Sequence, residues 1–202
     1  RVPEELPDVI AWLAETGRLS DSLRHREVAW KLDPLRGSNA FQAARGYLAL
    51  GRDAEARRMV KLARELGFAS SSLAHLEAHL EVRARHFDAA RALWEKNGDA
   101  EEARVMSAMY RALEDPTPDH KREARHEIRK LRPWHALPFR GQVYAACMLG
   151  DAGAAYDAAA AGVQQGLDAS DNWWIPECAS LRAHPGFKGL AGGMQFIDYW
   201  RE

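Results

Sequence analysis

Two histidines spaced one helical turn apart are the residues of this sequence most suggestive of chemistry. His75 and His79 occur in the stretch HLEAH, and their four-residue spacing places both side chains on one face of a helix. Imidazole pairs of this kind begin many zinc sites. The metalloprotease signature has a glutamate directly after the first histidine, but Leu76 stands there in this sequence. No third ligand is evident, although His86 is near. We therefore favour groove-lining or solvated histidines, and keep a small helical metal protein or enzyme built on them as the alternative.

Other reactive groups lack the pattern that a catalytic site requires. Cys147 and Cys178 form no CxxC pair, and a single pair cannot staple a chain of 202 residues. Cys147 falls in YAACML, where a packed thiol is expected, so we predict reduced thiols and a cytoplasmic protein. Glu101 and Glu102 open a predicted helix, where carboxylates favour the helix dipole. The patterns GxxxxGK[ST], GxGxxG and GxSxG do not occur. We predict no enzymatic activity and no cofactor.

The composition is that of a folded globular protein. Apolar residues make up 47% and charged residues 28%, and the net charge of −1 argues against a basic nucleic-acid binder. The most basic stretch, residues 120–132, commits Ala124 and Ile128 to a core face, so nucleic acid is not the expected partner. No apolar run approaches about 18 residues, so we predict no membrane span. The sequence opens on Arg1 and not on methionine, which suggests a fragment of a longer protein.

A repeat of 34 residues organises the elements that must position these side chains. Gly17 lies 34 residues before Gly51, and Arg85 lies 34 residues after it. Ala29 and Ala63 follow the same spacing. Such glycines end helices because they adopt the left-handed backbone without steric cost. With a closing Leu-Asp-Pro at residues 32–34 and the stretch HFDAARALW at residues 86–94, the sequence resembles the tetratricopeptide repeat, whose unit is a helix–turn–helix of 34 residues.

The resemblance implies one all-α domain over residues 1–202, built as a right-handed solenoid of stacked helical pairs with a C-terminal cap. We expect pairs at about 3–34, 38–68, 70–97, 99–132 and 136–166, and a cap at 172–202. Trp173, Trp174, Phe187 and Trp200 would cover the end of the stack, since an uncovered end exposes apolar surface. The third pair has a second apolar stripe, which includes Leu76, one residue off the strict register. Its register therefore stays open.

The tail carries a second resemblance. The stretch LRAHPGF and the pair Tyr199-Trp200 are similar to the ends of tetratricopeptide effector domains in bacterial signalling proteins and transcriptional regulators. That similarity implies a non-catalytic protein- or peptide-binding scaffold or sensor, as part of a larger bacterial regulator.

The resemblance also locates the binding surface, because the first helix of each tetratricopeptide pair lines the concave face where ligands lie. Projecting that face onto this sequence selects a set of cations with a few aromatic and apolar residues: Phe41, Arg45, Leu48, His75, His79, Arg83, Arg104, Arg111, Arg140 and Tyr144. Such a set suits an acidic peptide or a terminal carboxylate. The alternative is ordinary solvated helix arginines. A register shift in the third pair would move both histidines off this face.

Overall fold

The computed structural model describes residues 6–130, 137–165 and 170–194. These residues form helices and turns without a β-strand, so the all-α class is confirmed. Among them no helix has both the length and the apolar composition that a membrane span requires. The helices, in chain order, are α1 (Leu6–Glu15), α2 (Leu19–Leu32), α3 (Gly37–Ala49), α4 (Asp53–Glu65), α5 (Ser71–Arg83), α6 (Phe87–Asn97), α7 (Ala100–Glu114), α8 (Pro118–Lys130), α9 (Leu137–Met148), α10 (Ala152–Gln164), the 3₁₀ helices η1 (Ser170–Trp174) and η2 (Pro176–Cys178), α11 (Ala179–Arg182) and α12 (Phe187–Gly193).

The first three helical pairs turn at residues with a left-handed backbone. Their φ angles are 81° at Gly17, 72° at Gly51 and 62° at Arg85. The 34-residue spacing of these turns therefore continues through the third pair, although a bulky residue occupies the third turn. α5 buries residues of both stripes, including Ala78 and Leu80. The register that the sequence left open is the strict one.

Small side chains allow the helices of a pair to pack closely. Ala40, Ala43 and Ala44 of α3 and Ala56 and Ala63 of α4 are fully buried. The core continues along the chain of helices as successive clusters, first over α2–α5, then over α5–α9 and finally over α9–α12. Each pair thus completes its core against its neighbours, as expected of elements that cannot bury an apolar stripe alone.

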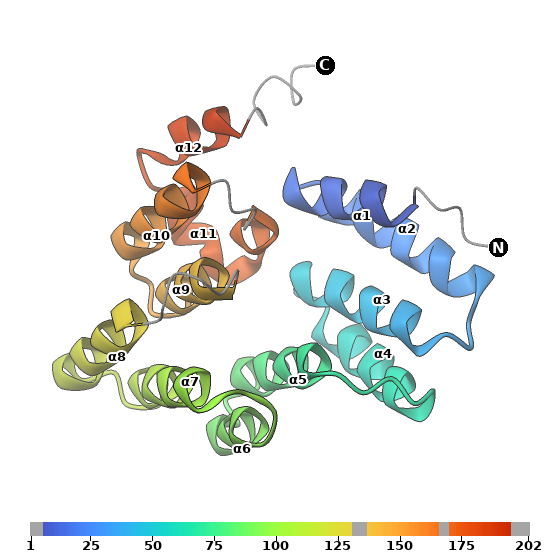
Figure 1. Ribbon diagram of the computed structural model, residues 1–202, viewed down its shortest axis with the longest axis horizontal. Helices are drawn as coiled ribbons and strands as arrows, with labels where there is room; N and C mark the ends of the chain where they lie inside the picture. The colour runs from blue at the N-terminus through green and yellow to red at the C-terminus, as the bar shows by residue number, and fades with distance from the viewer. Residues whose placement is uncertain (1–5, 131–136, 166–169, 195–202) are drawn as a thin grey trace.

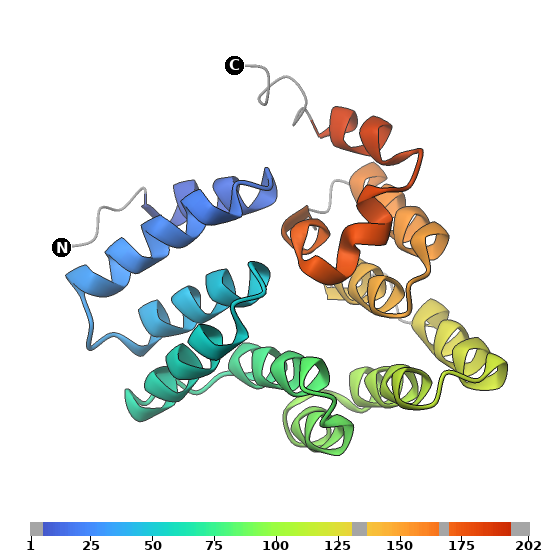
Figure 2. The ribbon, with the colours of Figure 1, turned by 180° about the vertical axis from the view of Figure 1, so that it is seen from behind.

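The helices follow a curved path that brings the C-terminal part of the molecule beside the N-terminal pair (Figure 1), and the reverse view shows the same arrangement (Figure 2). Trp173 and Phe187 pack with α9 and α10, while the indole of Trp174 reaches α1. Its Nε1 donates a hydrogen bond of 2.7 Å to the Glu15 carbonyl, 159 residues away. The tail therefore contacts both ends of the array and not only the last pair. Trp200 and Tyr199 lie outside the described residues.

A disulfide joins Cys147 of α9 to Cys178 at the end of η2. The prediction of two reduced thiols is therefore wrong. The cysteines are 31 residues apart in sequence, but the packing of η2 on α9 brings their Cα atoms within 4.8 Å. Disulfides persist mainly in oxidising compartments. The cytoplasmic location loses the support that reduced cysteines would have lent it, and it stays a prediction.

Candidate functional site

A cavity of about 390 Å³ lies on the inner side of the curved array. It is lined by side chains from α1, α2, α3, α5, α6, α7, α9, η1 and η2. Its volume lies at the lower end of the range of roughly 300–1,000 Å³ that is typical of small-molecule sites. We call it the central cavity, and describe it wall by wall.

The wall formed by α2 and α3 carries two arginines above an apolar base. Phe41, Arg45 and Leu48 follow one another at helical spacing and all face the cavity. Arg26, only 5% exposed, also lines it. Its Nη1 donates to the backbone carbonyl of Gln42 (3.2 Å) and to the Gln42 side-chain oxygen. This wall is positively charged.

The opposite wall, from α5, α6 and α7, is aromatic. The imidazole of His75 stacks on Trp94, with ring centroids 3.9 Å apart and planes within 13°. Trp94 Nε1 in turn donates to the buried Tyr110 hydroxyl at 2.8 Å. His75 Nε2 is buried and has no hydrogen-bond partner in the described part of the chain. Burial lowers the pKa of His75, so its ring is neutral at pH 7.

Three carboxylates stand at the start of α7, beside this aromatic wall. Asp99 caps the helix by accepting a 2.8 Å hydrogen bond from the Glu102 backbone, and Glu101 and Glu102 follow it. All three line the cavity. A Cβ atom at Gly98 would lie 3.0 Å from Trp94 Cε3 and 3.6 Å from Glu102 Oε2, so this carboxylate neighbours the indole. Sequence reasoning assigned these acids only a role at a helix start and did not place them in the site.

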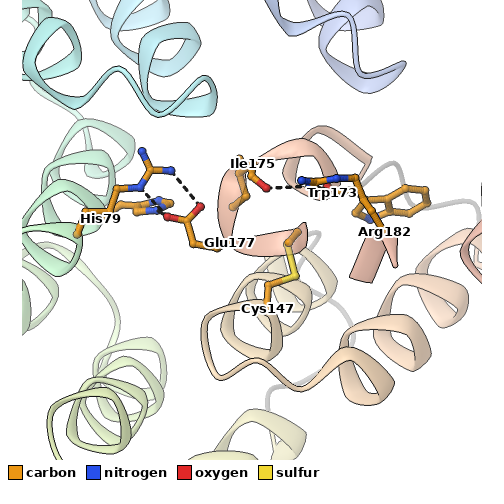
Figure 3. Close-up of a disulfide and its surroundings, with 8 residues drawn as sticks. His79, Cys147, Trp173, Ile175, Glu177 and Arg182 are labelled. Atoms are coloured by element: carbon orange, nitrogen blue, oxygen red, sulfur yellow. Dashed lines mark hydrogen bonds and ion pairs between the residues drawn. A yellow bond between two sulfur atoms is a disulfide. The ribbon is translucent and has the colours of Figure 1, made fainter. Parts of the chain in front are cut away.

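A buried ion cluster closes the inner side of the array next to the cavity (Figure 3). Glu177 of η2 accepts hydrogen bonds from Arg83 Nε (2.6 Å) and Nη2 (3.0 Å), and its Oε1 lies 3.0 Å from His79 Nε2. Arg83 also donates to Asp53 (2.5 Å) and to the Leu48 carbonyl (2.9 Å). The side chains of Arg83 and Glu177 are only 12% and 14% exposed. The cluster therefore ties η2 to α4 and α5.

The protonation states in this cluster follow from burial and charge. Burial by itself would raise the pKa of the Glu177 carboxyl, but hydrogen bonds from His79 and Arg83 lower it well below its usual range. Burial lowers the pKa of His79 more than the nearby Glu177 raises it. At pH 7 a neutral His79 thus donates its Nε2 proton to an ionised Glu177, and Arg83 supplies the positive charge. Nothing near Glu177 in the sequence marks it as this partner.

The structure brings together a majority of the predicted binding residues. Those that line the central cavity are Phe41, Arg45, Leu48, His75, His79 and Tyr144.

Three predicted arginines are placed differently. Arg83 is engaged by Glu177. Arg104 and Arg111 lie on the side of α7 that faces α8, where they pair with Glu127 (2.8 Å) and Glu123 (3.1 Å). The predicted continuous strip of cations is therefore wrong, because α7 turns other residues toward the cavity. Arg140 belongs to α9, but its side chain lies outside the described residues.

For the metal alternative, the described residues contain no group of three His, Cys, Asp or Glu side chains placed to hold an ion. Comparison with protein-family models, with curated proteins and with solved structures found no match. The functional argument therefore rests on the geometry of the central cavity.

Proposed function

We propose that this chain is a non-catalytic binding module whose central cavity holds a peptide ligand. The observation that carries the proposal is the cavity itself, which is assembled from helices of every part of the array and has the volume of a ligand site. It combines a large apolar and aromatic surface with a few charged groups, the usual composition of binding pockets. The resemblance of the tail to bacterial effector domains supports a role as the sensor part of a larger regulator.

The state of the polar groups in the cavity favours binding over catalysis. A catalytic nucleophile requires an adjacent base and donors for a developing negative charge. Here the hydroxyl of Ser22 is committed to the Ile10 carbonyl (2.9 Å), and His79 is committed to Glu177. His75 is stacked against Trp94. These interactions hold the walls in place and leave no pairing of nucleophile and base among the described lining residues.

The contact of η2 with α5 supports a peptide as the ligand class. Residues 175–178 are themselves a short segment of chain lying against the inner side of the array, and their Glu177 carboxylate is bound by side chains of α5. Ile175 of the same segment lines the cavity. The inner surface thus already accommodates a peptide segment by a charge-assisted contact and an apolar one.

A cavity-filling substitution tests the proposal. Ala49 is half-buried and lines the cavity, whereas Ala89 is exposed on α6. Peptides selected from a displayed random library on the purified protein are measured by calorimetry against Ala49→Trp and, as the matched control, Ala89→Trp. We expect Ala49→Trp to weaken binding about tenfold or more, equivalent to about 1.4 kcal/mol, and Ala89→Trp to leave it unchanged. Both variants should keep the same far-UV circular dichroism.

Failure to select any peptide would contradict the proposal. Equal affinity of the two tryptophan variants would contradict it as well, because it would place the binding surface outside the cavity.

A further inference from the structure

We infer that the ligand of the central cavity is a short zwitterion with an aromatic or apolar body, a free amino acid or a very short peptide, bound through both of its charged ends. This inference rests on the proposed function and specifies its ligand.

The first argument is the distribution of charge around the cavity. Arg26 and Arg45 come from α2 and α3, and the carboxylates of Asp99, Glu101 and Glu102 come from the start of α7. Figure 1 shows α5 between these two groups of helices. The two walls therefore carry opposite charge across an apolar centre. A purely acidic ligand would meet the three carboxylates, and a purely cationic one would meet the two arginines. A ligand with one charge of each sign matches both walls.

The second argument is the location of the anion-binding groups. The bidentate cation Arg83 and its neighbour His79 already hold Glu177. A ligand carboxylate is therefore directed to the α2–α3 wall, while an ammonium group is directed to the α7 wall. Glu102 lies beside the Trp94 indole there, and a carboxylate next to an aromatic face suits an ammonium ion.

The third argument is the chemistry of the centre. The stacked rings of His75 and Trp94, together with Phe41 and Met106, offer surface to an aromatic or branched body. Two polar atoms near this centre, His75 Nε2 and the Tyr144 hydroxyl, are buried without a hydrogen-bond partner in the described part of the chain. Buried polar atoms are normally satisfied. The amide or ammonium groups of a peptide would supply such partners, whereas a hydrocarbon would not.

The fourth argument is size. At about 390 Å³ the cavity lies near the lower limit of ligand pockets, and η1 and η2 occupy part of its rim through Asn172 and Ile175. These limits favour a ligand whose own two termini fall within the cavity over an internal segment of a long chain.

The test is calorimetry with L-tryptophan and with the dipeptide alanyl-tryptophan, each also in its N-acetylated, C-amidated and doubly blocked form. We expect at least one zwitterion to bind. Loss of either charge should weaken that binding about tenfold or more. The stronger of the two zwitterions identifies whether the source is a free amino acid or a peptide.

Variants assign the two ends. Glu102→Gln, or Glu101→Gln as a second choice at the same wall, should abolish the preference for a free amine. Arg45→Gln should abolish the preference for a free carboxylate. Arg104→Gln and Glu123→Gln, which change a pair on the α8 side of α7, serve as controls and should alter neither preference.

Equal binding of the zwitterion and its doubly blocked form would overturn the inference, and so would affinities weaker than about 1 mM for every zwitterion. If longer peptides nevertheless bind and respond to Ala49→Trp, the proposed function stands and only the ligand class is wrong. If neither class binds, both proposals fail.

Discussion

Replacing Glu177 by glutamine tests whether its carboxylate holds the C-terminal segment against the inner side of the array. The substitution keeps the shape of the side chain but removes the charge that accepts two hydrogen bonds from Arg83. Removing one partner of a buried ion pair typically costs about 3–5 kcal/mol, because the other charge is left uncompensated. Here Arg83 keeps Asp53 and the Leu48 carbonyl. We therefore expect a smaller loss, about 2–3 kcal/mol.

Thermal unfolding followed by far-UV circular dichroism measures this loss. For a chain of 202 residues, each kcal/mol shifts Tm by about 2–4 °C, so Glu177→Gln should lower Tm by roughly 5–10 °C. The matched control is Glu55→Gln. Its exposed pair with Arg52 spans 2.7 Å, with side chains 27% and 47% exposed, and such pairs contribute about 0–1 kcal/mol. Hydrogen exchange should also increase in residues 170–178.

The reasoning would be refuted if Glu177→Gln lowered Tm no more than Glu55→Gln. The ion cluster would then be a surface-like interaction, and the attachment of η2 would depend on the disulfide and on apolar packing alone.

Three further outcomes follow from the same structure. Reduction of the disulfide between Cys147 and Cys178, which are 31 residues apart, should lower the unfolding free energy by about 3–4 kcal/mol, and a variant with alanine at both positions should show no response to reductant. Stability should fall below about pH 6.5, because unfolded His79 binds a proton that the folded state disfavours. It should fall further below about pH 4.5, where the unfolded Glu177 carboxyl is protonated at a pH that still leaves the folded one ionised; denaturant titrations should show this second loss vanish in Glu177→Gln. Arg85→Gly should raise the unfolding free energy by about 0.5–1 kcal/mol, since it removes a left-handed strain at φ 62°, whereas Arg85→Ala keeps that strain and should give no gain in Tm.

The sequence by itself determined the elements and their pairing along the chain. Helix boundaries depend on local turn chemistry and on helical spacing, so Gly17 and Gly51 marked turns that the structure contains. The 34-residue period carried the same turn to Arg85, where composition alone would not have placed it. Helical spacing also selected Phe41 and His75 for the inner face, because residues on one face of a helix are fixed by their separation.

Only the tertiary structure decided which distant groups meet. Glu177 pairs with Arg83 across 94 residues, and Trp174 reaches Glu15 across 159. The side of α7 that faces the cavity, and hence the exclusion of Arg104, was likewise a matter of packing. The physical reason is that small rotations between successive helical pairs accumulate along the array. Whether its two ends approach each other, and which charges then line the space between them, depends on side-chain packing at every junction, and no local pattern in the sequence specifies that sum.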